Sequence, residues 1–133
     1  MKKLHYQLPL RIEQRINEKE IMKQESANFQ FEEKIEWQDL GGGVRRQIMG
    51  YNDNIMMVKV MFETGAIGAP HVHPHSQVTY VARGVFKFMT DGETQIVRAG
   101  DGVYMKPDVM HGCECLEAGI LIDTFNPLRE DFL

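Results

Sequence analysis

Four of the five histidines in this sequence lie in two short segments, and their spacing is typical of a metal site. Residues 70–75 read Pro-His-Val-His-Pro-His, and His111 lies far along the chain, directly before a glycine. Side chains two residues apart on an extended strand point the same way, so His71 and His73 can face one point. Gln77 shares that parity and adds an amide oxygen. The expected ligand set is therefore His71, His73, Gln77 and His111 around one divalent ion: Zn, Ni, Fe, Mn, Cu or Co.

The alternative is that these histidines are ordinary surface or core residues, as single histidines usually are. A His-x-His pair alone would be weak evidence for a metal, but the polar residue at 77 and the distant His111 strengthen it. His75 has the same parity as His73 but follows Pro74, which bends the chain. We therefore expect His75 at the rim of the site, outside the ligand set.

Length and composition fit one ordinary globular domain. The chain has 133 residues, of which 43% are hydrophobic and 26% charged, and this allows one core. Its net charge of −4 gives no reason to expect nucleic acid or an acidic membrane as a partner. No apolar run approaches the roughly 20 residues of a spanning helix, and none follows the basic start of the chain as a secretory signal requires. We therefore expect a cytoplasmic protein.

Residues 1–28 differ from the rest of the chain in composition and in the spacing of their apolar residues. Residues 9–25 contain no glycine, begin with a proline and carry Ile12, Ile16 and Met22 at loosely helical spacing among charges. We interpret this N-terminal arm as containing one amphipathic helix. The alternative is a partly disordered extension.

The elements that must position the candidate ligands are strands. From Phe29 onward, short apolar alternations are separated by Gly, Pro, Asn and Asp, with a loop expected over 64–70 and a turn at Arg83 and Gly84. Strands are predicted over 44–49, 55–63, 77–81, 85–90, 94–98, 102–105, 112–116 and 119–125. Such a series without intervening helices indicates an all-β barrel or two-sheet jelly roll over residues 29–133.

Several further side chains are expected inside this barrel. Arg45 and Arg46 point to opposite faces of one strand, so only one can enter, and we favour Arg46. Cys113 and Cys115 share strand parity with His111 and could line the same cavity, although small buried thiols are the simpler interpretation. The nine methionines are expected to fill the interior, several of them at positions 49, 56, 57, 61, 89 and 105.

Two segments resemble the motifs of the cupin superfamily. Residues 65–84 match the first motif as G-x5-HVH-x3-Q-x6-G, and residues 100–111, GDGVYMKPDVMH, match the second. The residue usual at position 77 of that pattern is glutamate, so Gln77 is a departure. The resemblance implies a single-domain cupin barrel, a double-stranded β-helix, preceded by the helical or flexible arm.

Residues 37–46, 51–54 and 121–132 resemble more closely the pectin-degradation cupin family. That family is dimeric, opens the ring of 4,5-unsaturated uronates from pectin or alginate, and holds its metal by three histidines and one glutamine. The resemblance implies three catalytic residues near the C-terminus, in the roles of proton shuttle, pocket wall and carboxylate-binding fork: Asp123, Phe125 and Arg129. Spacing alone indicates only that Asp123 and Phe125 share a strand face. The alternatives are an ordinary strand-end carboxylate for Asp123, a core residue for Phe125 and a solvated ion pair for Arg129.

The resemblance implies metal-dependent linearisation of unsaturated uronate monomers to 5-keto-4-deoxyuronate by a homodimer that binds a small sugar acid. A neutral glutamine leaves the ion its full positive charge, which favours Lewis-acid chemistry over oxygen activation. Two alternatives stay open: a non-catalytic, metal-bound sugar-acid sensor and a cupin oxygenase. The sequence decides neither the native metal nor the uronate epimer.

Overall fold

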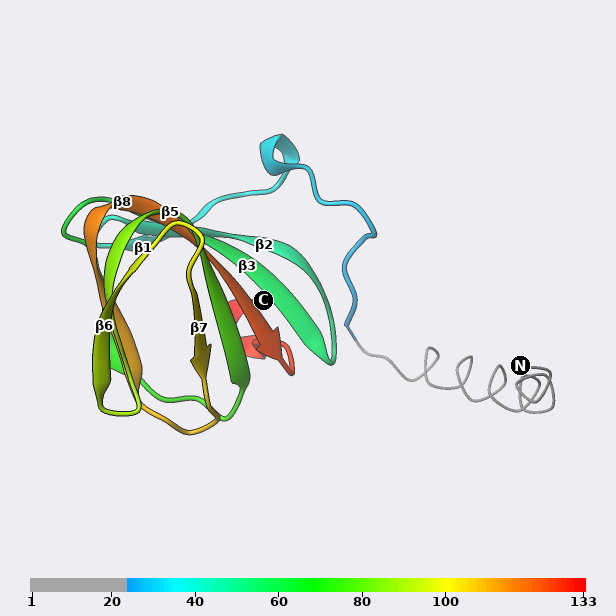
Figure 1. The fold of residues 1–133 in the computed structure, drawn as a ribbon. Helices are drawn as coiled ribbons and strands as arrows, with labels where there is room; N and C mark the ends of the chain where they lie inside the picture. Colours follow the sequence, from blue (N-terminus) through cyan, green and yellow to red (C-terminus); the bar gives the residue numbers. More distant parts are fainter. Residues whose placement is uncertain (1–23) are drawn as a thin grey trace, which may run out of the picture.

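Two long strands, β5 (Ser76–Thr90) and β8 (His111–Asn126), pair antiparallel along the centre of the computed structural model, which describes residues 24–133 (Figure 1). The register between them shifts at several points around Val81–Phe86. Such bulges let paired strands bend sharply. Each long strand therefore contributes its two halves to two different parts of the barrel wall.

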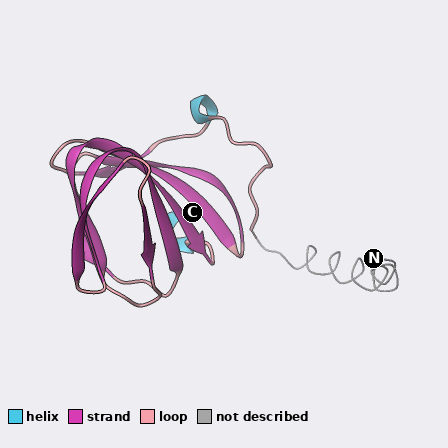
Figure 2. Ribbon diagram, viewed as in Figure 1, coloured by secondary structure: helices cyan, strands magenta, loops and turns pink. Residues whose placement is uncertain are grey.

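The remaining strands pair with the halves of these two. The first half of β5 pairs with β7 (Gly102–Met105), and its second half pairs with β6 (Glu93–Arg98). The first half of β8 pairs with β4 (Ile67–His71), and its second half pairs with β3 (Ile55–Phe62). On its other side β3 pairs with β2 (Val44–Asn52), which in turn pairs with β1 (Gln38–Gly41). Two short 3-10 helices lie outside the sheet, η2 (Glu32–Lys34) and η3 (Glu130–Phe132). Figure 2 shows the described chain as strands joined by loops, with little helix.

The core lies between the two parts of the wall, where alternate residues point inward. On β3, Met56, Val58, Val60 and Phe62 are buried, while the residues between them face outward or are only partly covered. Phe62 meets Phe86 of β5 edge to face, with 5.2 Å between ring centroids. The predicted all-β cupin barrel is confirmed.

Two glycines allow β5 and β8 to cross closely at the bend. Gly84 has a φ of +87°, and a Cβ built on it would lie 2.5 Å from the carbonyl oxygen of Glu117 and 2.6 Å from the Cα of Gly119. Residues other than glycine rarely adopt such a φ, and the opposing backbone cannot move away cheaply. The close approach of the two strands therefore depends on a missing side chain at position 84.

Replacing Gly84 by alanine is expected to lower the free energy of unfolding by about 2–4 kcal/mol, because a positive φ costs about 1–2 kcal/mol and overpacking adds to it. Gly92 is the matched control, since it has a φ of +75° but nothing within 4 Å of a built Cβ. Gly92→Ala should cost only the conformational part. Urea denaturation of both variants measures the difference, and equal losses would contradict the close-approach explanation.

Several predicted boundaries were wrong. The loop expected over 64–70 contains most of β4, the turn expected at residues 83–84 is a bulge within β5, and the strands expected over 112–116 and 119–125 form one strand. The sequence also gave no strand prediction for β1. In each case cross-strand pairing supplied hydrogen bonds that local turn signals do not reveal.

The methionine expectation was also largely wrong. Among the methionines of residues 24–133, only Met56 and Met105 are fully buried, and Met57 is 44% exposed. Met57 follows Met56 on the same strand, so the two must point to opposite faces. Burial of one methionine therefore requires exposure of the next.

The N-terminal region is described only from Gln24. The helix expected over 9–25 lies outside the described residues except at its end, where Glu25 forms an isolated β-bridge with Asn52. The boundary between an arm over 1–28 and a barrel over 29–133 stays a prediction. In the described part of the chain, no helix has the length and apolar character needed to cross a membrane.

Candidate metal centre and its surroundings

Three histidines converge at one end of the barrel. His71 is the last residue of β4 and His111 the first of β8, and the two are cross-strand partners. His73 lies in the connection between β4 and β5. The ligand atoms of all three lie within 4.8 Å of one another, so the group could hold a metal ion. Convergence of these three residues was predicted from the sequence, and the structure confirms it.

The reason given for that convergence was partly wrong. His71 and His73 were expected to share one face of a single strand, but β4 ends at His71. The connection after β4 turns His73 back toward β8, with 4.7 Å between the ring centroids of His73 and His111. Loop geometry and strand pairing, and not the two-residue repeat of a strand, bring the rings together.

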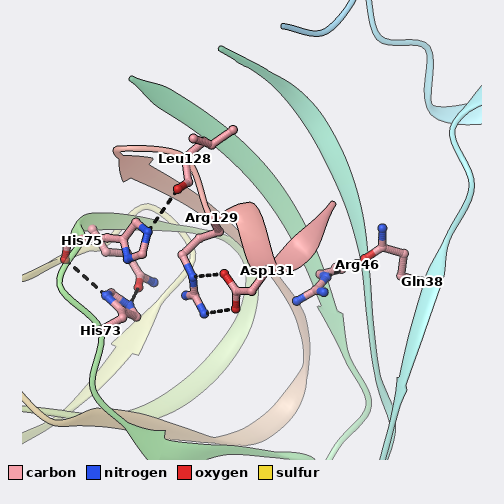
Figure 3. A network of polar contacts seen from close by, with 8 residues as sticks. Gln38, Arg46, His73, His75, Leu128, Arg129 and Asp131 are labelled. Carbon is pink, nitrogen blue, oxygen red and sulfur yellow. Dashed lines mark hydrogen bonds and ion pairs between the residues drawn. The ribbon is translucent and has the colours of Figure 1, made fainter. Parts of the chain in front are cut away.

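Each of the three imidazoles places its Nδ1 beside a backbone carbonyl oxygen. The contacts are His71 to Ala69 at 2.8 Å, His73 to His75 at 3.2 Å and His111 to Val109 at 3.0 Å. Figure 3 shows the His73 contact. A hydrogen bond from Nδ1–H leaves the Nε2 lone pair free, and histidines that bind metals are commonly oriented in this way.

The surroundings of Nε2 in His73 and His111 fit a cation. Burial lowers the pKa of His111 to about 4 and also lowers the pKa of His73, so both rings are neutral at neutral pH. The Nε2 atom of His111 is buried without a hydrogen-bond partner in the described structure. A buried polar atom of this kind calls for an explanation, and a bound ion is one.

Gln77, the second residue of β5, supplies an amide oxygen to the same place. Its Oε1 lies 2.8 Å from Nε2 of His73, while Nδ1 of His73 faces the carbonyl oxygen of His75. A neutral imidazole has one N–H for these two oxygens, so one contact joins two acceptors. A divalent cation between Nε2 and Oε1 would remove that conflict. The donor set is neutral nitrogen and oxygen, which suits borderline divalent metals.

Asp123 lies on β8, opposite Thr79 of β5. The hydroxyl of Thr79 donates to Asp123 Oδ1 at 2.6 Å. Burial raises the pKa of Asp123 to about 6, although the hydrogen bonds from Thr79 and Gln77 oppose this rise. A carboxyl group with a raised pKa in a cavity is suited to proton transfer near neutral pH.

Thr79 was not among the residues predicted for this site. Thr79 is fully buried and also accepts a hydrogen bond from Gln77 Nε2 at 3.1 Å. Strand parity could have found it, because residues 77 and 79 lie in one predicted strand. Its contact with Asp123 could not have been found, since it depends on the register between β5 and β8.

Phe125 is part of the hydrophobic core and also contacts the histidine cluster. It is 2% exposed, and its ring lies edge to face against His73 at 5.7 Å and against Phe132 at 5.7 Å. The structure therefore supports the interpretation of Phe125 as a core residue, and its role as a pocket wall stays a prediction. Its ring restricts where His73 can move.

Arg129 projects toward the same end of the barrel, with its guanidinium engaged (Figure 3). Its Nε and Nη2 donate to the two carboxylate oxygens of Asp131 at 3.0 and 2.9 Å. The guanidinium also lies over the rings of Phe125 and Phe132, at 5.2 and 4.3 Å from their centroids. Arg129 was expected to bind a substrate carboxylate, and this role stays a prediction. In the structure, two of its N–H groups are already bound to the carboxylate of Asp131.

Arg46 enters the barrel, as predicted. Its guanidinium lies 3.6 Å from the centroid of the Phe132 ring, and its Nε donates to Gln38 (Figure 3). Arg45 instead lies over Trp37 on the other face of the sheet. Burial lowers the pKa of Arg46, and the nearby Arg129 lowers it further. Two guanidinium groups therefore lie close together beside the candidate metal centre.

His75 is outside the group of three histidines, in agreement with its expected place at the rim. Its Nε2 contacts the backbone oxygen of Leu128 at 3.1 Å. The two thiols behave differently from each other: Cys115 is fully buried in the core beside Phe62, and Cys113 is partly buried. Burial raises the pKa of Cys113 to about 12, so this thiol stays protonated.

Comparison with known proteins agrees with this geometry. Residues 58–123 match the family model described as Cupin domain. The chain is 45% identical over 104 residues to the pectin degradation protein KdgF of Dickeya dadantii (strain 3937), covering 77% of this chain and 94% of that protein.

Solved structures give the same result. An RmlC-like cupin from Shewanella frigidimarina superposes with a TM-score of 0.81 at 48% identity, covering 84% of this chain and all of that one. The structure of KdgF from Halomonas sp. superposes with a TM-score of 0.77 at 35% identity, covering 81% of this chain and all of that one.

Proposed function

This chain belongs to the cupin family, and we propose that it is a metal-dependent enzyme that opens the ring of 4,5-unsaturated uronate monomers to give 5-keto-4-deoxyuronate. The observation that carries the proposal is the group of three histidines and one glutamine, linked through Thr79 to the carboxyl group of Asp123. The similarity to KdgF, a pectin degradation protein, supports the substrate class.

The proposed metal ligands are His71, His73, Gln77 and His111, with one divalent transition metal such as Ni, Zn, Fe, Mn or Co. When bound, such an ion supplies a positive charge that attracts the uronate carboxylate and polarises the oxygens beside it. The neutral ligands leave this charge undiminished. The burial of His111 and Gln77, and the lowered pKa values of His73 and His111, support these roles.

The reaction needs a proton and a water molecule in defined places. The alkene carbon C4 gains a proton and C5 gains the hydroxyl of water, and this gives a hemiketal. The bond between C5 and the ring oxygen then breaks, C5 becomes a ketone, and C1 loses water to become an aldehyde. No oxidant or reductant is consumed. We assign the proton transfers to Asp123, since its raised pKa allows it both to give and to take a proton.

Phe125 and the two arginines would orient the substrate. The Phe125 ring, which packs against His73, would exclude water from one side of the substrate. Arg129 has N–H groups beyond those bound to Asp131, and Arg46 donates to the neutral amide of Gln38. The two guanidinium groups carry two positive charges, and the carboxylate of Asp131 balances one of them. A uronate carboxylate would balance the other.

Replacing Arg129 by lysine is expected to raise KM for the uronate by about 10- to 100-fold, because lysine keeps the charge but loses the paired hydrogen bonds to a carboxylate. The matched control is Arg45→Lys, which changes an arginine on the outer face. Steady-state kinetics on both variants test this. An equal KM for the Arg129 variant and the unaltered protein would exclude Arg129 from carboxylate binding.

The function itself is tested by adding the purified protein to freshly generated unsaturated uronate and following the loss of alkene absorbance. We expect a decay faster than the spontaneous one, with the open keto-aldehyde as product by NMR. Decay at the spontaneous rate, with the sugar acid still bound, would favour a sensor. Consumption of oxygen in an oxygen electrode would favour an oxygenase.

We also propose a cytoplasmic homodimer. The similarity to the pectin-degradation cupin family, which is dimeric, supports the homodimer. Sedimentation of the purified protein at several concentrations tests it, and a single species with the mass of one chain would reject the dimer.

A further inference from the structure

Gln77 presents an oxygen to His73 only if its amide group has one of two orientations. The two faces of an amide differ chemically, since Oε1 accepts hydrogen bonds and Nε2 donates them. With the opposite orientation, Nε2 would point at the histidine cluster and its N–H groups would repel a cation. Some neighbouring group must therefore select the orientation that a metal requires.

Two neighbours accept a hydrogen bond from Gln77 and so favour this orientation: Thr79 and Asp123. The Oγ1 atom of Thr79 accepts a hydrogen bond from Gln77 Nε2 at 3.1 Å and donates one to Asp123 Oδ1 at 2.6 Å. A hydroxyl has a single proton, and Thr79 donates it to Asp123 Oδ1. The proton of Thr79 is therefore committed to Asp123, so that the side of Thr79 facing Gln77 is an acceptor.

We infer that Thr79 is a positioning residue that couples Asp123 to the metal ligand Gln77. The hydroxyl fixes the amide of Gln77 with Oε1 toward His73, and the same hydroxyl holds the carboxylate of Asp123 in place. Thr79 is fully buried and Gln77 is 5% exposed, so water is poorly placed to substitute for the hydroxyl. The inference rests on the proposed function for the role of Asp123, but not for the orientation of Gln77.

The test of the amide orientation uses cobalt(II) as the probe, because its visible absorption reports its ligands. Thr79→Val removes the hydroxyl and keeps the shape of the side chain. We expect its affinity for cobalt(II) to fall about 10- to 100-fold, the usual cost of losing a partner that orients a ligand. Thr79→Ser keeps the hydroxyl and should restore most of the affinity. If Thr79→Val does not fold, Thr79→Ala serves in its place, with circular dichroism of the metal-free proteins as the check.

A double-mutant cycle separates positioning from simple packing. Gln77→Glu offers an oxygen in either orientation of its carboxylate, so Thr79 has nothing left to select. Adding Thr79→Val to Gln77→Glu should then change cobalt(II) affinity far less than it does in the unaltered protein. Equal losses in the two backgrounds, or no loss in either, would overturn the inference.

Turnover of the uronate at saturating cobalt(II) tests whether Thr79 also positions Asp123. We expect kcat of Thr79→Val to stay low with the metal site filled, because the donor to Asp123 is missing. Recovery of full kcat at saturating metal would overturn the link to Asp123. If the unaltered protein shows no turnover while Thr79→Val still loses cobalt(II) affinity, the proposed function fails and the positioning of Gln77 stands.

Discussion

Replacing His111 by alanine is expected to lower the affinity for the divalent metal by more than about 100-fold and to abolish ring opening. Loss of groups that merely orient a ligand costs about 10- to 100-fold, so loss of a ligand should exceed this. The Nε2 atom of His111 is buried and without a partner in the described structure, so a bound ion is its expected contact. Metal content by mass spectrometry and the alkene assay measure the two effects.

The buried ring of His111 also packs inside the barrel, so its loss could disturb the fold. His71 offers a second variant, since its side chain is exposed at the end of β4. His71→Ala should lose metal and activity with less change in the free energy of unfolding. His75→Gln is the matched control outside the cluster and should keep its metal. Full metal content in both His71 and His111 variants would refute the site.

Chelation offers the same comparison without a mutation. Removing the metal with EDTA is expected to stop turnover, and adding back a single divalent metal should restore it. A bound ligand stabilises the folded state by about 2.7 kcal/mol at 100 times its dissociation constant, so the melting temperature should fall on chelation. The metal that restores both properties at the lowest concentration identifies the preferred ion.

Replacing Asp123 by asparagine is expected to lower kcat about 10²- to 10⁴-fold, the range that general acid–base groups contribute. Asparagine keeps a side-chain oxygen that can accept the hydrogen bond from Thr79. The metal site should therefore stay filled, and the loss should lie in the chemical step. Steady-state kinetics together with metal analysis of the same sample check this expectation.

Asp91→Asn is the matched control, because Asp91 lies on the surface in an ion pair with Lys106. Surface pairs of this kind contribute little to stability, and none of its contacts reaches the cavity. An Asp123→Asn enzyme with unaltered kcat would remove Asp123 from the mechanism. If the protein is a sensor without catalysis, the unaltered protein and the Asp123→Asn variant should bind the uronate equally well.

Some of the fold could be read from the sequence because its rules are local. Alternation of apolar residues places Met56, Val58 and Val60 on one face wherever that strand lies. The same rule predicted correctly that Arg46 enters the barrel and that Asp123 and Phe125 share a face. Boundaries were less accurate, because residues 67–71 carry loop signals and become β4 only by pairing with β8.

The candidate site, like the fold, could be predicted from the sequence only in part. The identity and spacing of His71, His73, Gln77 and His111 were sufficient to propose a ligand set, because few other arrangements of these residue types serve one ion. The hydrogen bond from Thr79 to Asp123 could not be predicted. It requires the register between β5 and β8, which brings together two residues that lie 44 positions apart along the chain.

The C-terminal residues depended even more on the tertiary structure. From the sequence, Arg129 could be a substrate-binding fork or a solvated ion pair, and the structure shows it bound to Asp131 while stacked over Phe125 and Phe132. The sequence states the residue types directly, and it predicts strand parity because parity depends only on near neighbours along the chain. Which distant side chains meet, and which partner a charged group takes, was decided by how β5 and β8 bend and pair, since contacts across the barrel exist only after the chain has closed.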